Sequence, residues 1–235
     1  MPESSVPVAL LSPARRARDA ATWRNTTIAE EAWKKAASQP DAIAFHLEHE
    51  PDVSFGQIAL AARRLVTALQ GLGLRAGEVI SFQLPNWPEA AAIDIAASAL
   101  GLVVNPVVPI YRDRELRFIL ADSRSRLIFV PERFRSIDYA AMLLGLQPEL
   151  PDLAHIVTVR ASGEIPGTLR YERITDVAPV DVASLPGVDP DSVKCRLYTS
   201  GTTGFPKAVL HSHNTLRRIN DNNIEHAGKI GRAHV

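Results

Sequence analysis

Two hydrophobic periods alternate along the chain. Apolar residues recur every three or four positions over 27–39, 55–71 and 90–100, a spacing that predicts helices. Short aliphatic and β-branched runs lie between these stretches, and such runs predict strands. The predicted strands cover 42–47, 53–55, 78–84, 103–110, 127–130 and 155–159, and further helices cover 112–121 and 137–146. Strands that alternate with helices of this length predict an α/β fold of βαβ units with a mainly parallel sheet.

Capping residues predict where several helices begin. Thr27 and Ser54 each stand three positions before a Glu or Gln, which is the spacing of a capping box. The segment 86–89 (Asn-Trp-Pro-Glu) has the same spacing and places proline in the first turn. The helix over 90–100 is apolar almost all round, so we expect it to be buried. By contrast, 161–191 is rich in Pro, Gly and Asp and is predicted to be a long surface connection.

Composition narrows the functional classes. The 235 residues carry 26 Lys and Arg against 26 Asp and Glu, so the chain lacks the net positive charge of nucleic-acid and anionic-membrane binders. Cys195 is the only cysteine, which excludes an internal disulfide and a cysteine-rich zinc site and favours a reducing, cytoplasmic compartment. The apolar stretch 88–102 contains Asp94 and is shorter than the roughly 20 residues that a membrane-spanning helix needs. We therefore expect a globular protein without an integral membrane segment or a nucleic-acid partner.

The chemistry-bearing residues gather in one segment, 197–210. Here a short strand leads into a loop of small hydroxylated residues and then into a second apolar strand. Two glycines in the loop allow successive backbone N–H groups to turn toward one anion. The hydroxyl groups add donors, Lys207 adds a positive charge, and Pro206 stiffens the approach to it. The segment predicts a phosphate cradle made of Thr199, Ser200, Gly201, Thr202, Thr203, Gly204 and Lys207.

Other loop classes fit this segment less well. A Walker A loop needs four residues between its first glycine and a Gly-Lys-Ser/Thr triplet, with a helix directly afterwards. Only two residues separate Gly201 from Gly204, and a strand-like Ala-Val-Leu follows Lys207. The Gly-x-Gly-x-x-Gly dinucleotide pattern does not match either. A ligand-free Ser/Thr/Gly hairpin loop is the remaining alternative, although such a linker does not normally join two apolar strands and end in Pro-Lys.

Residues Tyr198 to Ala208 resemble the Tyr-Thr-Ser-Gly-Thr-Thr-Gly-x-Pro-Lys-Gly signature of the adenylate-forming (AMP-binding) superfamily, with Ala208 in place of the final glycine. The resemblance continues through 209–213 and covers residues 26–220. Three upstream segments are similar to the cyclohexanecarboxylate and medium-chain acyl-CoA ligase branch, which would place the chain in fatty acid metabolism. These segments are 84–87, 102–112 and 131–141.

The resemblance implies that the chain forms the N-terminal, incomplete part of a large adenylation domain. It implies a reaction in which a carboxylic acid attacks the α-phosphate of ATP bound with Mg²⁺, and coenzyme A then displaces AMP. Thr199 to Gly204 would cradle the β- and γ-phosphates, and Lys207 would neutralise part of their charge. The family's remaining functional segments, its catalytic lysine included, follow its phosphate loop. None is found after Lys207, so we expect no catalytic residue in this chain. The alternative is a non-catalytic or inert product that at most binds phosphate.

The resemblance also suggests how the chain is divided. We expect a flexible leader over 1–25 and a partial adenylation domain over 26–228. The last residues, 229–235, are expected to be a non-native tail. The sequence Ile-Gly-Arg-Ala-His-Val at 230–235 matches the translation of a widely used sequencing adapter.

Candidates outside the loop are expected to be structural. His211 and His213 are expected to have structural or capping roles rather than to bind a metal together. Cys195 is expected to be a buried, inert thiol, whereas His46 and His49 are expected to be solvated. The remaining candidates are expected to be helix-start charges or packing residues, namely Asp19, Glu30, Glu31, Asp113, Glu115, Trp87 and Tyr111.

Overall fold

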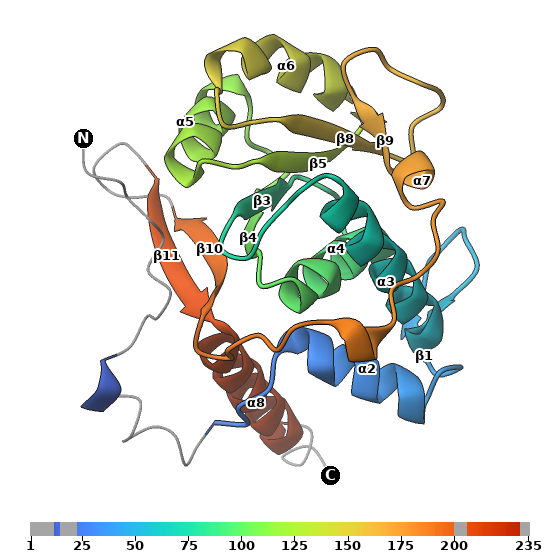
Figure 1. The fold of residues 1–235 in the computed structure, drawn as a ribbon, viewed down its shortest axis with the longest axis vertical. Coiled ribbons are helices and arrows are strands. Elements are labelled where there is room, and N and C mark those ends of the chain that lie inside the picture. Colours follow the sequence, from blue (N-terminus) through green and yellow to red (C-terminus); the bar gives the residue numbers. More distant parts are fainter. Residues whose placement is uncertain (1–11, 15–22, 200–205, 231–235) are drawn as a thin grey trace.

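A seven-stranded sheet forms the centre of the molecule (Figure 1). The computed structural model describes residues 12–14, 23–199 and 206–230. Every neighbouring pair of strands in the sheet is parallel except the first, which is antiparallel. In order across the sheet, the strands are β11 (Lys207–Ser212), β10 (Val193–Thr199), β4 (Val103–Pro106), β3 (Val79–Phe82), β5 (Leu127–Pro131), β8 (His155–Val159) and β9 (Leu169–Arg170). This arrangement confirms the predicted α/β fold with a mainly parallel sheet.

Two small antiparallel hairpins lie outside this sheet. The first joins β1 (Ile43–Phe45) to β2 (Val53–Ser54), which confirms the two short strands expected there. The second joins β6 (Arg133–Phe134) to β7 (Ile137–Asp138). The second hairpin corrects the expected helix over 137–146, because its first two residues pair as a strand.

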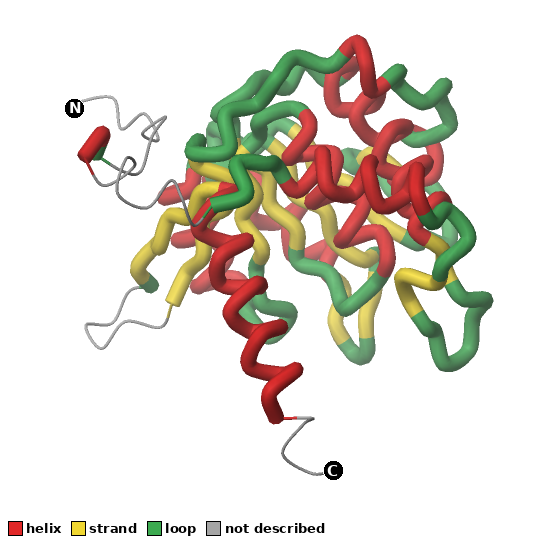
Figure 2. Tube along the Cα trace, turned by 90° about the horizontal axis from the view of Figure 1, so that it is seen from below, coloured by secondary structure: helices red, strands yellow, loops and turns green. Residues whose placement is uncertain are grey.

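Helices lie on both sides of the strands (Figure 2). Along β5, Leu127 and Phe129 belong to one core and Ile128 and Val130 to another. Successive strand residues point to opposite faces, so the two cores lie on opposite sides of the sheet. The first core is shared with α2 (Ile28–Ser38), α3 (Phe55–Gly71) and α4 (Pro88–Ala99), and the second with α5 (Asp113–Ser123) and α6 (Tyr139–Leu146).

Right-handed crossovers require this division. The connection from β3 to β4 crosses the sheet in one direction, and the connection from β4 to β5 crosses it in the other. Because both crossovers are right-handed, their helices α4 and α5 must cover opposite faces. The remaining helices are α7 (Tyr171–Ile174), α8 (His213–Ile230) and the 3₁₀ turns η2 (Gln147–Glu149) and η3 (Val182–Ser184).

All three predicted helix starts are confirmed. The Thr27 side chain accepts the N–H of Glu30, the Ser54 side chain accepts that of Gln57, and both capping boxes are complete. Helix α4 also begins within the predicted segment 86–89, although its N-cap is Trp87, which makes no side-chain cap, so the capping-box spacing there is not used. Pro88 lies in the first turn, as predicted, where its fixed φ angle favours the helix and its missing N–H needs no acceptor.

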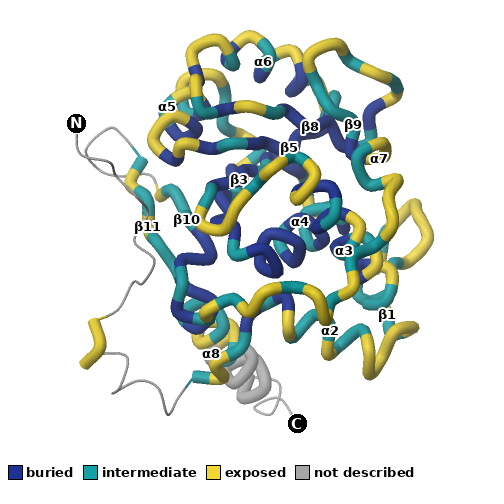
Figure 3. Tube along the Cα trace, in the orientation of Figure 1, coloured by how far each residue is buried: buried dark blue, intermediate teal, exposed yellow. Residues whose placement is uncertain are grey.

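Helix α4 is buried, as its apolar sequence predicts (Figure 3). Four of its six alanines, Ala92, Ala96, Ala97 and Ala99, are buried. Small side chains allow α2 and α3 to approach α4 closely, and all three helices contribute to one core. The helix thus acts as the inner layer on which the other two rest.

The long surface connection predicted over 161–191 needs correction. Residues 169 and 170 form β9 beside β8, and Tyr171 is only 8% exposed, with its ring edge against Phe129. Farther along, Val180 exchanges hydrogen bonds with Arg63 on α3. Pro and Gly mark turns correctly here, but apolar side chains between them pack against the core shared with α2, α3 and α4.

Gly101 should be intolerant of a side chain. Its φ angle is +66°, and an added Cβ would lie 3.3 Å from the Cβ of Ala76. Since the left-handed conformation costs an L-residue roughly 1–2 kcal/mol, we expect Gly101→Ala to lower the free energy of unfolding by about that amount. Gly71, at the end of α3, has no atom within 4 Å of an added Cβ and serves as the control. Gly71→Ala should leave stability unchanged or slightly higher in the same urea titration. Equal losses in both variants would contradict the assignment of strain to Gly101.

Candidate functional site

Strands β10 and β11 form the antiparallel hairpin that carries the predicted phosphate loop (Figure 1). Because β10 runs parallel to β4, with Cys195 opposite Val104, its loop leaves from the carboxyl edge of the parallel strands. Thr199 and Lys207 form the last pair of the ladder and are both exposed, and the Thr199 hydroxyl donates to the Lys207 carbonyl at 3.4 Å. Open α/β sheets bind ligands at this edge. The other predicted loop residues, Ser200, Gly201, Thr202, Thr203 and Gly204, lie outside the described residues.

Asp122, near the end of α5, holds the loop-proximal half of β10. Its Oδ2 accepts hydrogen bonds from the Tyr198 hydroxyl and from the Arg196 guanidinium, both at 2.5 Å. The Tyr198 ring also meets the ring of Phe118 edge-on, with 6.5 Å between centroids. Burial, together with the bond to Asp122, raises the pKa of Tyr198, so its phenol stays protonated and remains a donor.

Lys194 holds the other half of β10 against α4. This side chain is completely buried, and its Nζ donates to Oδ1 of Asp94 at 2.6 Å. A buried ammonium without a partner would cost several kcal/mol, so the carboxylate of Asp94 is required wherever Lys194 is buried. Sequence reasoning missed this pair because Asp94 lies 100 residues away on a helix predicted only to be apolar.

Cys195 is buried, as predicted. Burial raises the pKa of its thiol to about 11; the charge of Asp94 also raises it and that of Lys194 opposes the change. A thiol with this pKa is almost entirely protonated at neutral pH and is a poor nucleophile. The prediction of an inert thiol therefore agrees with its surroundings.

His213 links the hairpin to the beginning of the domain. Its side chain is 1% exposed, and its Nδ1 accepts the backbone N–H of Ile28, the first residue of α2, at 3.3 Å. Burial, and then the charges of Lys194 and Arg217, lower its pKa from 6.5 to about 3. His213 is therefore neutral and satisfies one of the free N–H groups at the start of a helix. This placement agrees with the predicted structural or capping role.

Further polar contacts join the same two parts of the chain. Asn214 accepts the backbone N–H of Asn25 at 3.2 Å, and its own amide donates to Asp191 at 2.8 Å. Arg24 pairs with Asp221 on α8 at 2.8 Å. The segment before α2 is thus bound to the segments on both sides of the hairpin.

Arg160 is a second residue that sequence reasoning missed. It follows β8 at the carboxyl edge, has a φ angle of +56°, and bonds Glu89 and Glu50, each at 2.7 Å. Its guanidinium lies 4.5 Å from the ring centre of Trp87. Burial acts to lower the pKa of Arg160, but the two carboxylates outweigh it and raise that pKa. Because Trp87 contacts the Arg160 guanidinium, it is a packing residue of this edge. No sequence signal connects Arg160 with Trp87 or with the two glutamates.

The weaker candidates occupy the places that were expected. His46 and His49 are exposed, and Tyr111 packs against the core under α5 and α6. The acids at the start of α2 and α5 lie in first turns, namely Glu30, Glu31, Asp113 and Glu115, whereas Asp19 lies outside the described residues. Within residues 12–14, 23–199 and 206–230, no three His, Cys, Asp or Glu side chains gather as a metal site would require. In the same part of the chain, no helix is both long and apolar enough to cross a bilayer.

Comparison with known proteins identifies the family. The family model described as AMP-binding enzyme matches residues 32–230, which is most of the chain. The chain belongs to the AMP-binding enzyme family. It is 30% identical over 218 residues to the medium-chain fatty-acid–CoA ligase of Escherichia coli K12, covering 91% of this chain and 38% of that protein. It is 35% identical over 166 residues to the sulfoacetate–CoA ligase of Cupriavidus necator, covering 70% of this chain and 30% of that protein.

A solved structure supports the same assignment. The apo structure of MbtA from Mycobacterium smegmatis aligns with this chain at a TM-score of 0.75 and 26% identity. The alignment covers 91% of this chain and 39% of that structure. The fold predicted from the resemblance, the N-terminal part of an adenylate-forming enzyme, is thereby confirmed. The chain spans less than two fifths of the length of these three relatives.

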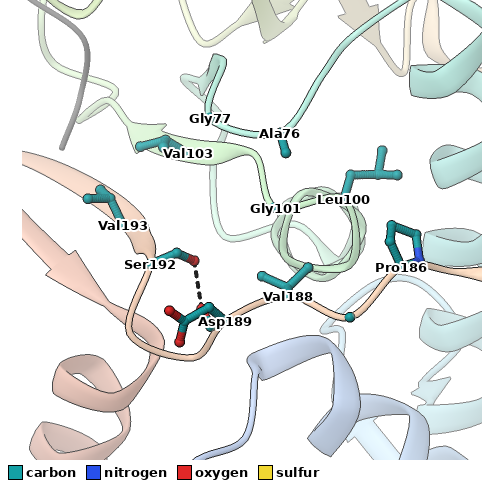
Figure 4. Close-up of a pocket in the computed structure, with 11 residues that line it drawn as sticks. Ala76, Gly77, Leu100, Gly101, Val103, Pro186, Val188, Asp189, Ser192 and Val193 are labelled. Atoms are coloured by element: carbon teal, nitrogen blue, oxygen red, sulfur yellow. Dashed lines mark hydrogen bonds between the residues drawn. The ribbon is translucent and has the colours of Figure 1, made fainter. Parts of the chain in front are cut away.

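The chain also has an apolar cavity of about 350 Å³ at the opposite, amino edge of the sheet (Figure 4). Gly77, Gly101 and Val193, which lie at or just before the starts of β3, β4 and β10, line it. Its polar lining includes Ser192 and Asp189, and the Ser192 hydroxyl donates to the Asp189 carbonyl at 2.7 Å. Because the phosphate loop leaves from the other end of β10, this cavity is separate from the candidate site.

Replacing His213 with Asn should remove a pH dependence of stability. The unfolded chain takes up a proton as the pH falls through 6.5, whereas folded His213, with its pKa of about 3, does not. Its contribution is therefore complete above pH 6.5 and is lost progressively as the pH falls from 6.5 toward 3. Asn offers an oxygen to Ile28 in place of Nδ1 but does not titrate. Urea unfolding at about pH 7.5 and about pH 5.5 should show a loss about 1.4 kcal/mol larger in the wild type than in His213→Asn.

The exposed His46 supplies the control, since its side chain is 81% accessible. His46→Asn should retain the pH dependence of the wild type. If His213→Asn also retained it, the assignment of His213 as a neutral buried acceptor would be wrong.

Proposed function

We propose that this chain supplies the ATP-phosphate-binding part of an acid–thiol ligase, which joins a carboxylic acid to coenzyme A through an acyl-adenylate. The observation that carries the proposal is the pairing of Thr199 with Lys207 where the hairpin opens at the carboxyl edge of the sheet. Between them lies a loop of glycines and hydroxylated residues that matches the family signature. Similarity to the medium-chain fatty-acid–CoA and sulfoacetate–CoA ligases supports the reaction class.

The proposed first step is attack by a carboxylate oxygen on the α-phosphorus of ATP. A new oxygen–phosphorus bond forms, the bond to the leaving pyrophosphate breaks, and negative charge develops on the departing oxygen. Donors already fixed around the β- and γ-phosphates stabilise this charge without reorganising during the reaction. The ammonium of Lys207 would act as a point charge, which suits a phosphate chain whose orientation is set by the loop.

The proposed second step is attack by the coenzyme A thiol on the carbonyl carbon of the acyl-adenylate, with AMP as the leaving group. We assign no residue of this chain to that step. We also assign none to Mg²⁺, because the described residues offer no cluster of carboxylates or imidazoles for it, and the ion would arrive as part of its complex with ATP. The acid is defined here only by its carboxylate.

A non-catalytic phosphate-binding chain is the second candidate. The chain spans 38% and 30% of the lengths of the two CoA ligases, and the phosphate loop is the part of the family's machinery that its sequence matches. Such a chain would bind the phosphates and catalyse neither step.

Lys207→Ala should weaken binding of inorganic pyrophosphate to the 235-residue chain. Loss of one charge-assisted hydrogen bond corresponds to about tenfold in the dissociation constant. Isothermal titration with pyrophosphate would measure it. Lys34, an exposed lysine on α2, is the matched control, and Lys34→Ala should bind as the wild type does. Unchanged affinity in Lys207→Ala would refute the phosphate role of this lysine.

Exchange of labelled pyrophosphate into ATP separates the two candidates. We expect no exchange by the 235 residues alone. If the reading frame continues at the locus, the extended chain should catalyse exchange that depends on an added carboxylic acid. An extended chain that binds pyrophosphate without exchanging it would favour the non-catalytic candidate.

A further inference from the structure

Strand β10 has one extra residue in its pairing with β11. Val193 pairs with Ser212, but the next pair along the ladder is Cys195 with His211, so two residues of β10 advance against one of β11. This is the arrangement of a β-bulge, and Lys194 is the extra residue. A bulge changes which face the following side chains point to, and such features recur next to functional sites.

The bulge allows one strand to reach two helices on opposite faces of the sheet. In a regular strand, Lys194, Arg196 and Tyr198 would all point to the same face. Here Lys194 bonds Asp94 on α4, whereas Arg196 and Tyr198 bond Asp122 on α5. At the bulge the strand is therefore fixed from one side, and downstream of it from the other.

Downstream of the bulge, Arg196 and Tyr198 attach the strand to Phe118 and Asp122 on one face of α5, and we call this set of contacts the clamp. Phe118 and Asp122 are four residues apart, so they lie next to each other on that helix. The rings of Phe118 and Tyr198 form a T-shaped pair, and Asp122 accepts from both the Tyr198 hydroxyl and Arg196. The guanidinium of Arg196 lies 5.5 Å from the same ring. These contacts end one residue before Thr199, where the phosphate loop begins.

We propose that Asp122 is a positioning residue for the phosphate loop. Acting through Arg196 and Tyr198, it fixes the twist and register of the last residues of β10 and so sets where Thr199 stands against Lys207. Without Asp122, the strand would remain attached upstream through Lys194 but would be free at its loop end. The identity of the ligand rests on the proposed function. The effect of Asp122 on the position of β10 does not depend on it.

Asp122→Ala tests the clamp. The Asp122 side chain is 43% exposed, so its removal leaves no cavity in the core. Cross-strand nuclear Overhauser contacts, measured by NMR in the 235-residue chain, should persist between Cys195 and His211 but be lost between Thr199 and Lys207. Pyrophosphate affinity should fall about tenfold, the equivalent of one charge-assisted hydrogen bond. Asp122→Asn, which keeps an acceptor oxygen, should recover part of both signals.

Two other variants complete the test. Glu149→Gln removes the charge of Glu149, which pairs at the surface with Arg117 of α5, and it should change neither signal. Tyr198→Phe removes only the hydroxyl, leaves the charge pair in place, and keeps the test available should Asp122→Ala not fold. It should weaken the Thr199–Lys207 contacts in the same direction.

The outcomes separate this proposal from the proposed function. Retention of the Thr199–Lys207 contacts in Asp122→Ala would overturn the positioning role, whatever the affinity. A uniform loss of cross-strand contacts along the whole hairpin would also overturn it, because that would indicate general unfolding of the hairpin. If the wild type itself does not bind pyrophosphate, the proposed function fails, whereas a selective loss of the loop-end contacts would still support the clamp.

Discussion

A parallel strand cannot return to its neighbour by a tight turn, and this constraint organises the molecule. Each parallel pair formed by consecutive strands needs a crossover long enough to span the sheet, and helices supply it. Both faces are therefore covered, which explains why β5 is buried at every residue and why α4 is apolar nearly all round. The same constraint gathers the carboxyl ends of the strands at one edge. The hairpin that carries Thr199 and Lys207 opens there because β10 shares the direction of β4.

The two ends of the described domain are held together by polar contacts. His213 caps α2 through Ile28, and Asn214 joins Asn25 to Asp191. These groups are mostly buried, so each needs its partner to remain satisfied. The start of α2 and the start of α8 consequently belong to one structural unit, although nearly the whole sequence separates them.

Local patterns predicted the elements well because their causes are local. Thr27 and Ser54 find their partners three residues away, and the strand at 127–130 is marked by its own apolar run. By contrast, the two-residue strand β9 is too short to show a period. Turn residues around it dominated the prediction for 161–191, so its buried contacts were missed.

The chemistry of the candidate site could be predicted from the sequence, but the contacts that hold its hairpin in place could not. The signature at 198–208 marks the loop, and the structure adds that Thr199 and Lys207 lie opposite each other in the ladder. The phosphate role of each residue stays a prediction. The residues that hold the hairpin, Asp122 and Asp94, were missed because each meets β10 across a sequence separation of 74 residues or more. Nothing within a helical or strand period connects such residues.

The position of β10 has a consequence for the order in which the chain folds. Its parallel neighbour is β4, but strands β5, β8 and β9 lie between β4 and β10 in the sequence. They extend the sheet on its other side. Docking β10 closes a long loop, and the entropy of that closure must be lost before its contacts form. During synthesis, β3, β4, β5 and β8 can pair while β10 is still absent. We therefore expect the hairpin of the phosphate loop to join a sheet that is already assembled, at a rate set by topology more than by local propensity.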